Sequence, residues 1–193
     1  MQDQDQSRID LTSDVKKANK ALFPIMLLLI AFIYFLYNNI NNSNLYNDLR
    51  SAVGSYDNTF LFLLIYLLCL VFLIIFHAYL HAFFLIIFGH LKKENIKVVI
   101  ENKKLMPFVS HDVPVQVAAY RRALFLPYLL LGLAPLAYGI MERLPLIVFA
   151  GMLICICYMG DIPLLFKLAK IDKEYMAISH PGKYGCFLYK KKK

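Results

Sequence analysis

Long apolar blocks separated by short polar segments dominate the sequence. The blocks cover about residues 21–37, 58–91, 115–141 and 144–168. From Asn58 to Leu91 no side chain carries a permanent charge, whereas a helix needs about 20 mostly apolar residues to cross a bilayer. A soluble domain of similar size interrupts its apolar runs every few residues. The pattern therefore predicts an all-α integral membrane protein with about four transmembrane helices, organised as a single membrane domain over residues 1–193.

The polar segments differ in what they predict. Residues 92–122 hold a β-branched run at Ile96–Ile100, a turn-like stretch, and a second run at Leu105–Val109. Pro107 cannot donate to a β-ladder, so the second run is typical of an edge strand. We expect a small cytoplasmic β-hairpin between the second and third helices. Residues 38–57 are expected to be a polar loop, and residues 169–193 a cytoplasmic tail.

Prolines modify the last two predicted helices. Pro127 and Pro135 lie inside the third apolar block, and Pro163 lies inside the fourth. Proline lacks the backbone N–H that a helix interior requires and collides with the preceding turn. We therefore expect the third helix to be kinked and the fourth to be disturbed near Pro163.

The distribution of basic residues predicts the orientation in the membrane. The net charge is +8, but the basic residues lie in short segments between apolar blocks, which excludes nucleic acid as the expected partner. Four Lys or Arg precede the first block, seven lie in residues 92–122 and seven follow residue 168, whereas residues 38–57 and 142–143 have one each. The positive-inside rule then predicts that both termini lie in the cytoplasm. We expect a multi-pass protein of the cell (inner) membrane, embedded in the lipid bilayer.

Two histidines in the second block carry the candidate chemistry. His77 and His81 stand four residues apart, so a helix places them one above the other on one face, where two imidazoles can hold one metal ion. In the His-Glu-x-x-His motif of zinc proteases, the glutamate beside the first histidine is the general base. Ala78 occupies the position of that glutamate.

A catalytic zinc usually has three protein ligands, and the apolar blocks contain one acid, Asp161. An acid inside a membrane segment indicates a functional site. Counted from the outer ends of their helices, His77 lies 77 − 57 = 20 residues in and Asp161 lies 161 − 143 = 18 residues in. At 1.5 Å per residue these are about 30 and 27 Å. The predicted topology therefore places His77, His81 and Asp161 at similar depth, near the cytoplasmic side.

The histidine pair late in one apolar block and Gly160-Asp161 late in another resemble the site-2 type of intramembrane zinc metalloprotease. Four predicted helices and the closing sequence from His180 to Gly185 resemble most closely the compact bacterial zincin peptidases. The resemblance implies that His77, His81 and Asp161 bind Zn²⁺ and that the enzyme hydrolyses a membrane-bound peptide or protein. It also implies that Ala78 replaces the catalytic glutamate, so that this chain is inactive.

The predicted hairpin is a candidate substrate site. Peptide bonds inside a helix are shielded, so a substrate has to unwind near the metal, and an edge strand can hold an extended peptide by strand addition. We expect Val98, Val99 and Val109 to contact the substrate.

Three alternatives remain open from the residues alone. The alanine at position 78 is either an exchange that traps substrate or the mark of a natural pseudoprotease, which binds without cutting. The histidines and Asp161 could also serve a non-enzymatic membrane assembly protein, or a small transporter with a proton relay. Many transporters carry a duplicated half, which is not evident in this sequence.

Overall fold

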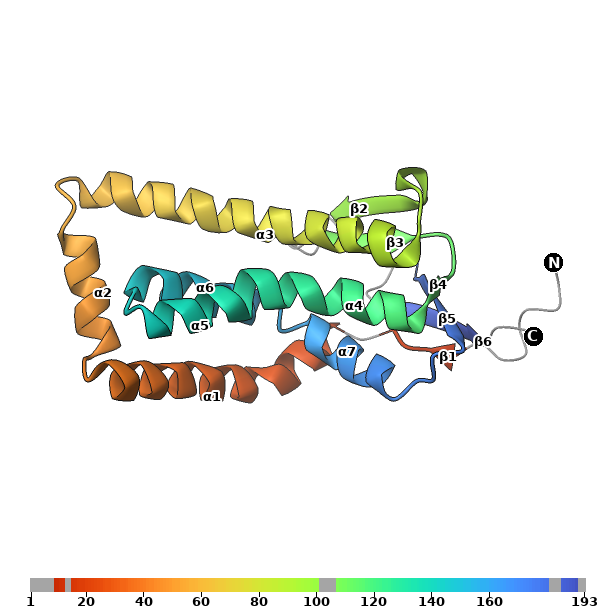
Figure 1. Ribbon diagram of the computed structural model, residues 1–193, viewed down its shortest axis with the longest axis horizontal. Coiled ribbons are helices and arrows are strands. Elements are labelled where there is room, and N and C mark those ends of the chain that lie inside the picture. Colours follow the sequence, from red (N-terminus) through yellow and green to blue (C-terminus); the bar gives the residue numbers. More distant parts are fainter. Residues whose placement is uncertain (1–8, 13–14, 101–106, 181–184, 191–193) are drawn as a thin grey trace. The chain divides into compact units, whose positions relative to one another are not determined.

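The computed structural model describes residues 9–12, 15–100, 107–180 and 185–190. The helices in this part of the chain are α1 (Val15–Asn41), α2 (Leu45–Gly54), α3 (Thr59–Gly89), α4 (Val117–Tyr128), α5 (Ala134–Met141), α6 (Pro145–Cys157) and α7 (Asp161–Ala169). The strands are β1 (Ile9–Asp10), β2 (Ile96–Ile100), β3 (Pro107–His111), β4 (Val115–Gln116), β5 (Tyr175–Ser179) and β6 (Cys186–Lys190). Figure 1 shows these elements. The chain is mostly helical, but the prediction of an all-α protein with one hairpin omitted a second sheet.

Three helical stretches of the described chain are long and apolar enough to cross a bilayer: Leu22–Asn41, Thr59–Gly89 and Val117–Met141. The third stretch includes a π-helical segment, Leu129–Leu133, between the two prolines that predicted a kink. Helices α6 and α7 meet the same criterion only as a pair, and they are bent by 64° at the break between them. By length and composition the chain has three candidate spans, or four if the bent pair is one span.

Contacts between residues divide the chain into two compact units. Unit 1 contains residues 1–20, 77–127 and 160–193, and unit 2 contains residues 21–76 and 128–159. Helix α3 begins in unit 2 and ends in unit 1. That the whole chain is one membrane domain stays a prediction.

Unit 1 contains a four-stranded antiparallel sheet in the order β1-β6-β5-β4 (Figure 1). Strand β1 pairs Ile9 with Leu188 of β6, and Ala177 of β5 pairs with both Leu188 and Val115. The expectation of a plain tail after residue 168 was therefore incomplete, because the tail supplies the two central strands. Ala177 and Leu188 are fully buried and join the core of unit 1, so the apolar residues of the tail are held by packing.

The predicted hairpin is confirmed as β2 and β3, which pair antiparallel with Val98 opposite Val109. Strand β3 ends at His111, two residues beyond the prediction. Residues 101–106, and with them the predicted turn, lie outside the described residues. The side chain of Val99 also lies outside the described part.

Unit 2 contains a helix where a polar loop was expected. Helix α2 begins after Asn44, whose side-chain oxygen accepts hydrogen bonds from the backbone N–H groups of Tyr46 and Asn47 at 3.0 and 3.3 Å. Asparagine is among the preferred N-cap residues because it satisfies such N–H groups. The polar residues that suggested a loop over residues 38–57 therefore include Asn44, which is the N-cap of α2.

A polar cluster fixes α2 within unit 2. The carboxylate of Asp48 accepts hydrogen bonds from the hydroxyls of Ser43 at 2.8 Å and Tyr37 at 2.9 Å, and from Arg143 Nε at 3.3 Å. The hydrogen bond from Ser43 is the largest cause that lowers the pKa of Asp48, and Arg143 and Tyr37 also lower it. The ionised carboxylate thereby joins α1, α2 and the turn between α5 and α6.

Helices α5 and α6 pack closely through glycines. A Cβ atom added at Gly151 would lie 2.9 Å from the backbone nitrogen of Leu136, and one added at Gly139 would lie 2.9 Å from that of Val148. Small residues let apolar helices approach closely and gain dispersion contacts. The turn between α5 and α6 is tight, and Arg143 within it has a positive φ of 55°.

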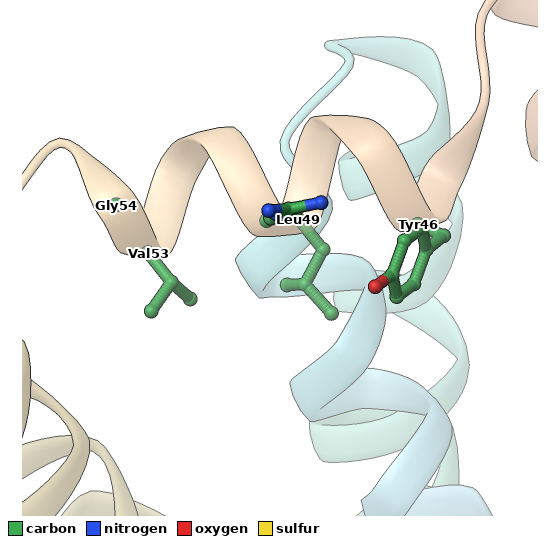
Figure 2. Close-up of a pocket in the computed structure, with 5 residues that line it drawn as sticks. Tyr46, Leu49, Val53 and Gly54 are labelled. Carbon is green, nitrogen blue, oxygen red and sulfur yellow. The ribbon is translucent and has the colours of Figure 1, made fainter.

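One side of α2 borders a shallow hollow of unit 2. It is lined by Tyr46, Leu49, Arg50, Val53 and Gly54, whose spacing places them on one helical face. Figure 2 shows Tyr46, Leu49 and Val53 extending from this side. None of the predicted metal ligands lines the hollow.

Candidate metal centre

Helix α3 presents both histidines on its buried face. His77 is 1 % exposed and His81 is 9 % exposed, and their rings meet edge-on with centroids 4.4 Å apart. Ala78, between them in sequence, is 2 % exposed, whereas the next residue, Tyr79, is 58 % exposed. The helix is apolar on all sides, so its hydrophobic pattern does not define this face. The buried face is identified instead by the low exposure of His77, Ala78 and His81.

Asp161 is the first residue of α7, directly after the break in the predicted fourth helix. The break follows from Pro163, because a continuous helix would need the missing N–H of residue 163 to bond to the carbonyl of Met159. In the first turn of a new helix that N–H has no intrahelical partner in any case, so Pro163 is tolerated there. Helix α6 therefore ends at Cys157, and the new helix α7 begins at Asp161.

The structure brings the three predicted ligands together within unit 1. One nitrogen of each histidine and a carboxylate oxygen of Asp161 all lie within 4.8 Å of one another. His81 Nε2 lies 3.4 Å from Asp161 Oδ2. His77 and His81 come from α3 and Asp161 from α7.

A backbone carbonyl fixes the orientation of His81. Its Nδ1 lies 2.8 Å from the carbonyl oxygen of Ala123 in α4. A carbonyl oxygen can only accept a hydrogen bond, so Nδ1 carries the proton and donates it, which leaves the lone pair of the neutral ring on Nε2. A second hydrogen bond of this kind is the usual support of a metal-binding histidine. The unprotonated Nε2 of His81 therefore faces Asp161.

The donor set fits zinc. Two imidazole nitrogens and one carboxylate oxygen are typical ligands of a catalytic zinc, and two ligands about 2.1 Å from one tetrahedral ion lie about 3.4 Å apart. The distance between His81 Nε2 and Asp161 Oδ2 is 3.4 Å, longer than a charge-assisted hydrogen bond of about 2.7–2.9 Å. With Nδ1 protonated, Nε2 and Oδ2 are both acceptors, so a cation between them would satisfy both.

The buried cysteine of unit 1, Cys186, lies outside the cluster and is not a candidate ligand. Cys186 of β6 is fully buried, and burial raises the pKa of its thiol to about 12. Metals bind the thiolate, which this pKa makes scarce at neutral pH.

His111 is also a buried histidine of unit 1. It ends β3, is 2 % exposed and donates from Nδ1 to the carbonyl of Val113 at 2.9 Å. Burial is the main cause that lowers its pKa. His111 is not part of the three-ligand cluster.

The predicted substrate residues are not part of this cluster. Val98 and Val109 face each other across the hairpin, and Val109 packs against the core of unit 1. Their role in substrate binding stays a prediction.

Sequence reasoning missed the Ala123 carbonyl. A backbone carbonyl has no sequence signature, because every residue carries one. A search for small residues on the helix that packs beside a histidine pair could have suggested Ala123, since a small side chain allows the ring to approach the backbone.

The comparisons with known proteins point to one family. Residues 70–176 match the model of the family described as "Putative zincin peptidase". No match was found among curated proteins or solved structures. The matched segment spans more than half of the chain and includes His77, His81 and Asp161. The chain therefore belongs to the zincin peptidase family, which suggests a metallopeptidase and implies zinc as its metal.

Proposed function

We propose that this protein is an intramembrane zinc metalloendopeptidase of the site-2 type. Its substrate is a membrane-associated peptide or protein, cut near the cytoplasmic side of the cell membrane. The observation that carries the proposal is the convergence of His77, His81 and Asp161, whose ligand atoms lie within 4.8 Å of one another. Two of the three ligands lie on α3, which is long and apolar enough to cross a bilayer. A metal site on such a helix supports peptide hydrolysis within the membrane.

When bound, zinc supplies Lewis acidity and lowers the pKa of a water molecule. The protein's own residues hold the site ready for this chemistry. The carbonyl of Ala123 keeps the proton of His81 on Nδ1, and the break before Asp161 delivers the carboxylate. The buried position of His77 and His81 limits competing water. These contacts preorganise the ligands, so that little reorganisation is needed when a substrate arrives.

The β2–β3 hairpin is proposed to hold the substrate. It follows α3 directly after the 3₁₀ turn Lys93–Asn95, and it forms a two-stranded sheet that no third described strand joins. A two-stranded sheet has free hydrogen-bonding edges, which can accept an extended peptide. Val98, Val99 and Val109 are the residues proposed to contact it.

Ala78 makes this chain a binder that does not turn over its substrate. The residue lies on the buried face that carries the two histidines, and it has no group that could accept a proton. Without a general base, metal and substrate binding persist while hydrolysis slows. This same observation favours the second candidate, a non-catalytic membrane-embedded pseudoprotease or assembly protein whose metal site has a structural role.

Metal content tests the proposal. Purified protein is expected to contain about one zinc per chain, and Asp161→Ala is expected to lose most of it. Asp172→Ala is the matched control, because Asp172 is an exposed acid after α7 that is outside the cluster. Equal zinc in the original protein, Asp161→Ala and Asp172→Ala would remove Asp161 from the site, and protein without zinc would exclude the metallopeptidase.

A further inference from the structure

A tyrosine in the break between α6 and α7 is hydrogen-bonded to the helix that carries both histidines. Tyr158 directly follows α6 and is 6 % exposed. Its hydroxyl donates a hydrogen bond of 2.5 Å to the backbone carbonyl of Ile74 in α3. Both residues belong to unit 2. The segment between α6 and α7 is therefore attached to α3 through this side chain.

The hydrogen bond lies three residues before the first histidine and three before the acid. Ile74 precedes His77 by 77 − 74 = 3 residues, and Tyr158 precedes Asp161 by 161 − 158 = 3 residues. In an α-helix the carbonyl of residue 74 also accepts the N–H of residue 78, and a carbonyl oxygen has two lone pairs for this purpose. The phenol therefore binds the turn of α3 that contains His77 and Ala78.

The backbone next to the acid has room to move. A Cβ atom added at Gly160 would meet nothing within 4 Å, and the helices are interrupted between Cys157 and Asp161. Met159 is buried, but apolar packing is non-directional, whereas a hydrogen bond has a defined length and angle. The bond from Tyr158 is thus the contact in this break that can specify a position along α3.

We propose that Tyr158 is a positioning residue of the metal centre. Its hydrogen bond to Ile74 fixes the point on α3 beside which the break lies, and so keeps the Asp161 carboxylate at the level of the histidines. The effect passes through the backbone, along α3 to His77 and across the break to Asp161. This inference rests on the proposed zinc site, and it adds a supporting residue that the ligand motif does not contain.

The test is Tyr158→Phe, which removes the hydroxyl and keeps the ring. Loss of a group that supports metal ligands lowers metal affinity by about 10-fold or more. We expect a loss of this size when the purified protein competes with a zinc chelator. The visible absorption spectrum of the Co²⁺-loaded protein should also change, because it responds to the arrangement of the ligands and not to the stability of the fold.

Tyr66→Phe is the matched control. The hydroxyl of Tyr66 in α3 donates to the carbonyl of Leu146 in α6 at 2.8 Å, and both residues also belong to unit 2. This variant therefore loses the same kind of hydrogen bond between the same two segments of chain. Tyr66 lies 77 − 66 = 11 residues before His77, which is roughly 16 Å along the helix. It should retain the original zinc affinity and Co²⁺ spectrum, even if its thermal stability in chelator falls as much as that of Tyr158→Phe.

A rescue experiment separates the hydrogen bond from the shape of the side chain. Incorporating 4-aminophenylalanine at position 158 restores a donor at the same end of the ring, and it should recover the zinc affinity that Tyr158→Phe loses. Unchanged affinity and spectrum in Tyr158→Phe would overturn the inference, as would equal losses in Tyr158→Phe and Tyr66→Phe or a failed rescue. Asp161→Ala identifies failure of the zinc site itself: if that variant keeps its zinc, the proposed metal centre is wrong, and Tyr158 has no ligand to position.

Discussion

Replacing Ala78 by glutamate tests whether this fold can perform hydrolysis. Ala78 is 2 % exposed and lies beside His77 on the face of α3 that carries both histidines. A side chain at position 78 is thus directed into the protein, whereas one at the neighbouring Tyr79, which is 58 % exposed, is directed outward. From the His-Glu-x-x-His motif, we expect a carboxylate at position 78 to act as the general base of hydrolysis.

A glutamate at position 78 is expected to change both the rate of hydrolysis and the stability of the fold. General-base catalysis typically contributes about 10²–10⁴-fold to the rate, which corresponds to about 3–5 kcal/mol of transition-state stabilisation. Against this, enlarging a buried side chain typically costs about 1–3 kcal/mol of stability. Zinc binding to the folded state offsets such a cost, so we expect Ala78→Glu to be active when loaded with zinc and less stable than the original chain in a chelator.

The assay is co-expression of each variant with candidate membrane peptides that the Ala78 chain captures, read by the size of the peptide. Ala78→Glu should cut a captured peptide. Ala78→Gln is the control, since it has the same shape but no basic group, and it should bind without cutting. If Ala78→Glu retains zinc and binds the peptide yet leaves it intact, the enzyme interpretation is wrong for this protein and the pseudoprotease interpretation stands.

Three further predictions concern topology, substrate and fold. A cysteine label placed on α2 should react from outside the cell and one on the β2–β3 hairpin only from inside, because of the Lys and Arg distribution; labelling of the hairpin from outside would reverse the orientation. Photocrosslinkers at Val98 and Val109 should capture substrate while probes on α2 do not, and silence at both valines would exclude strand addition at the hairpin. Gly185→Ala should destabilise the sheet by about 1–3 kcal/mol, since Gly185 has a φ of 130° and an added Cβ would lie 2.7 Å from Thr12 Cα. Gly54→Ala, which meets nothing within 4 Å, is its control in thermal unfolding, and equal stability of the two variants would contradict the close approach.

Local patterns were enough to predict α3 and the β2–β3 hairpin. Both depend on continuous runs whose residues pair or pack with near neighbours in sequence. The four-stranded sheet could not be predicted in the same way, because β1 and β4 have two residues each and β1 pairs with β6 from the opposite end of the chain. Strands this short acquire their conformation from the partner and from burial, neither of which leaves a periodic pattern in the sequence.

The residues of the candidate metal cluster were predictable for a different reason. His77, His81 and Asp161 are polar groups in apolar surroundings, where an unexplained ionisable residue is costly and therefore informative. The group that orients His81 was not predictable. Ala123 contributes a backbone carbonyl, and every residue carries one, so only the fold distinguishes it.

The position of Asp161 at a helix break also has an electrostatic consequence. In an unbroken helix the backbone N–H groups around residue 161 would bond to the preceding turn, and the acid would be an isolated charge in an apolar segment. The break places Asp161 in the first turn of α7, where the N–H groups have no intrahelical acceptors. The partial positive charge at a helix N-terminus stabilises a nearby carboxylate. Pro163 therefore contributes twice: it ends the preceding helix, and it exposes the positive end of α7 to the acid. The negative charge of this candidate metal ligand is thereby partly compensated by the protein itself.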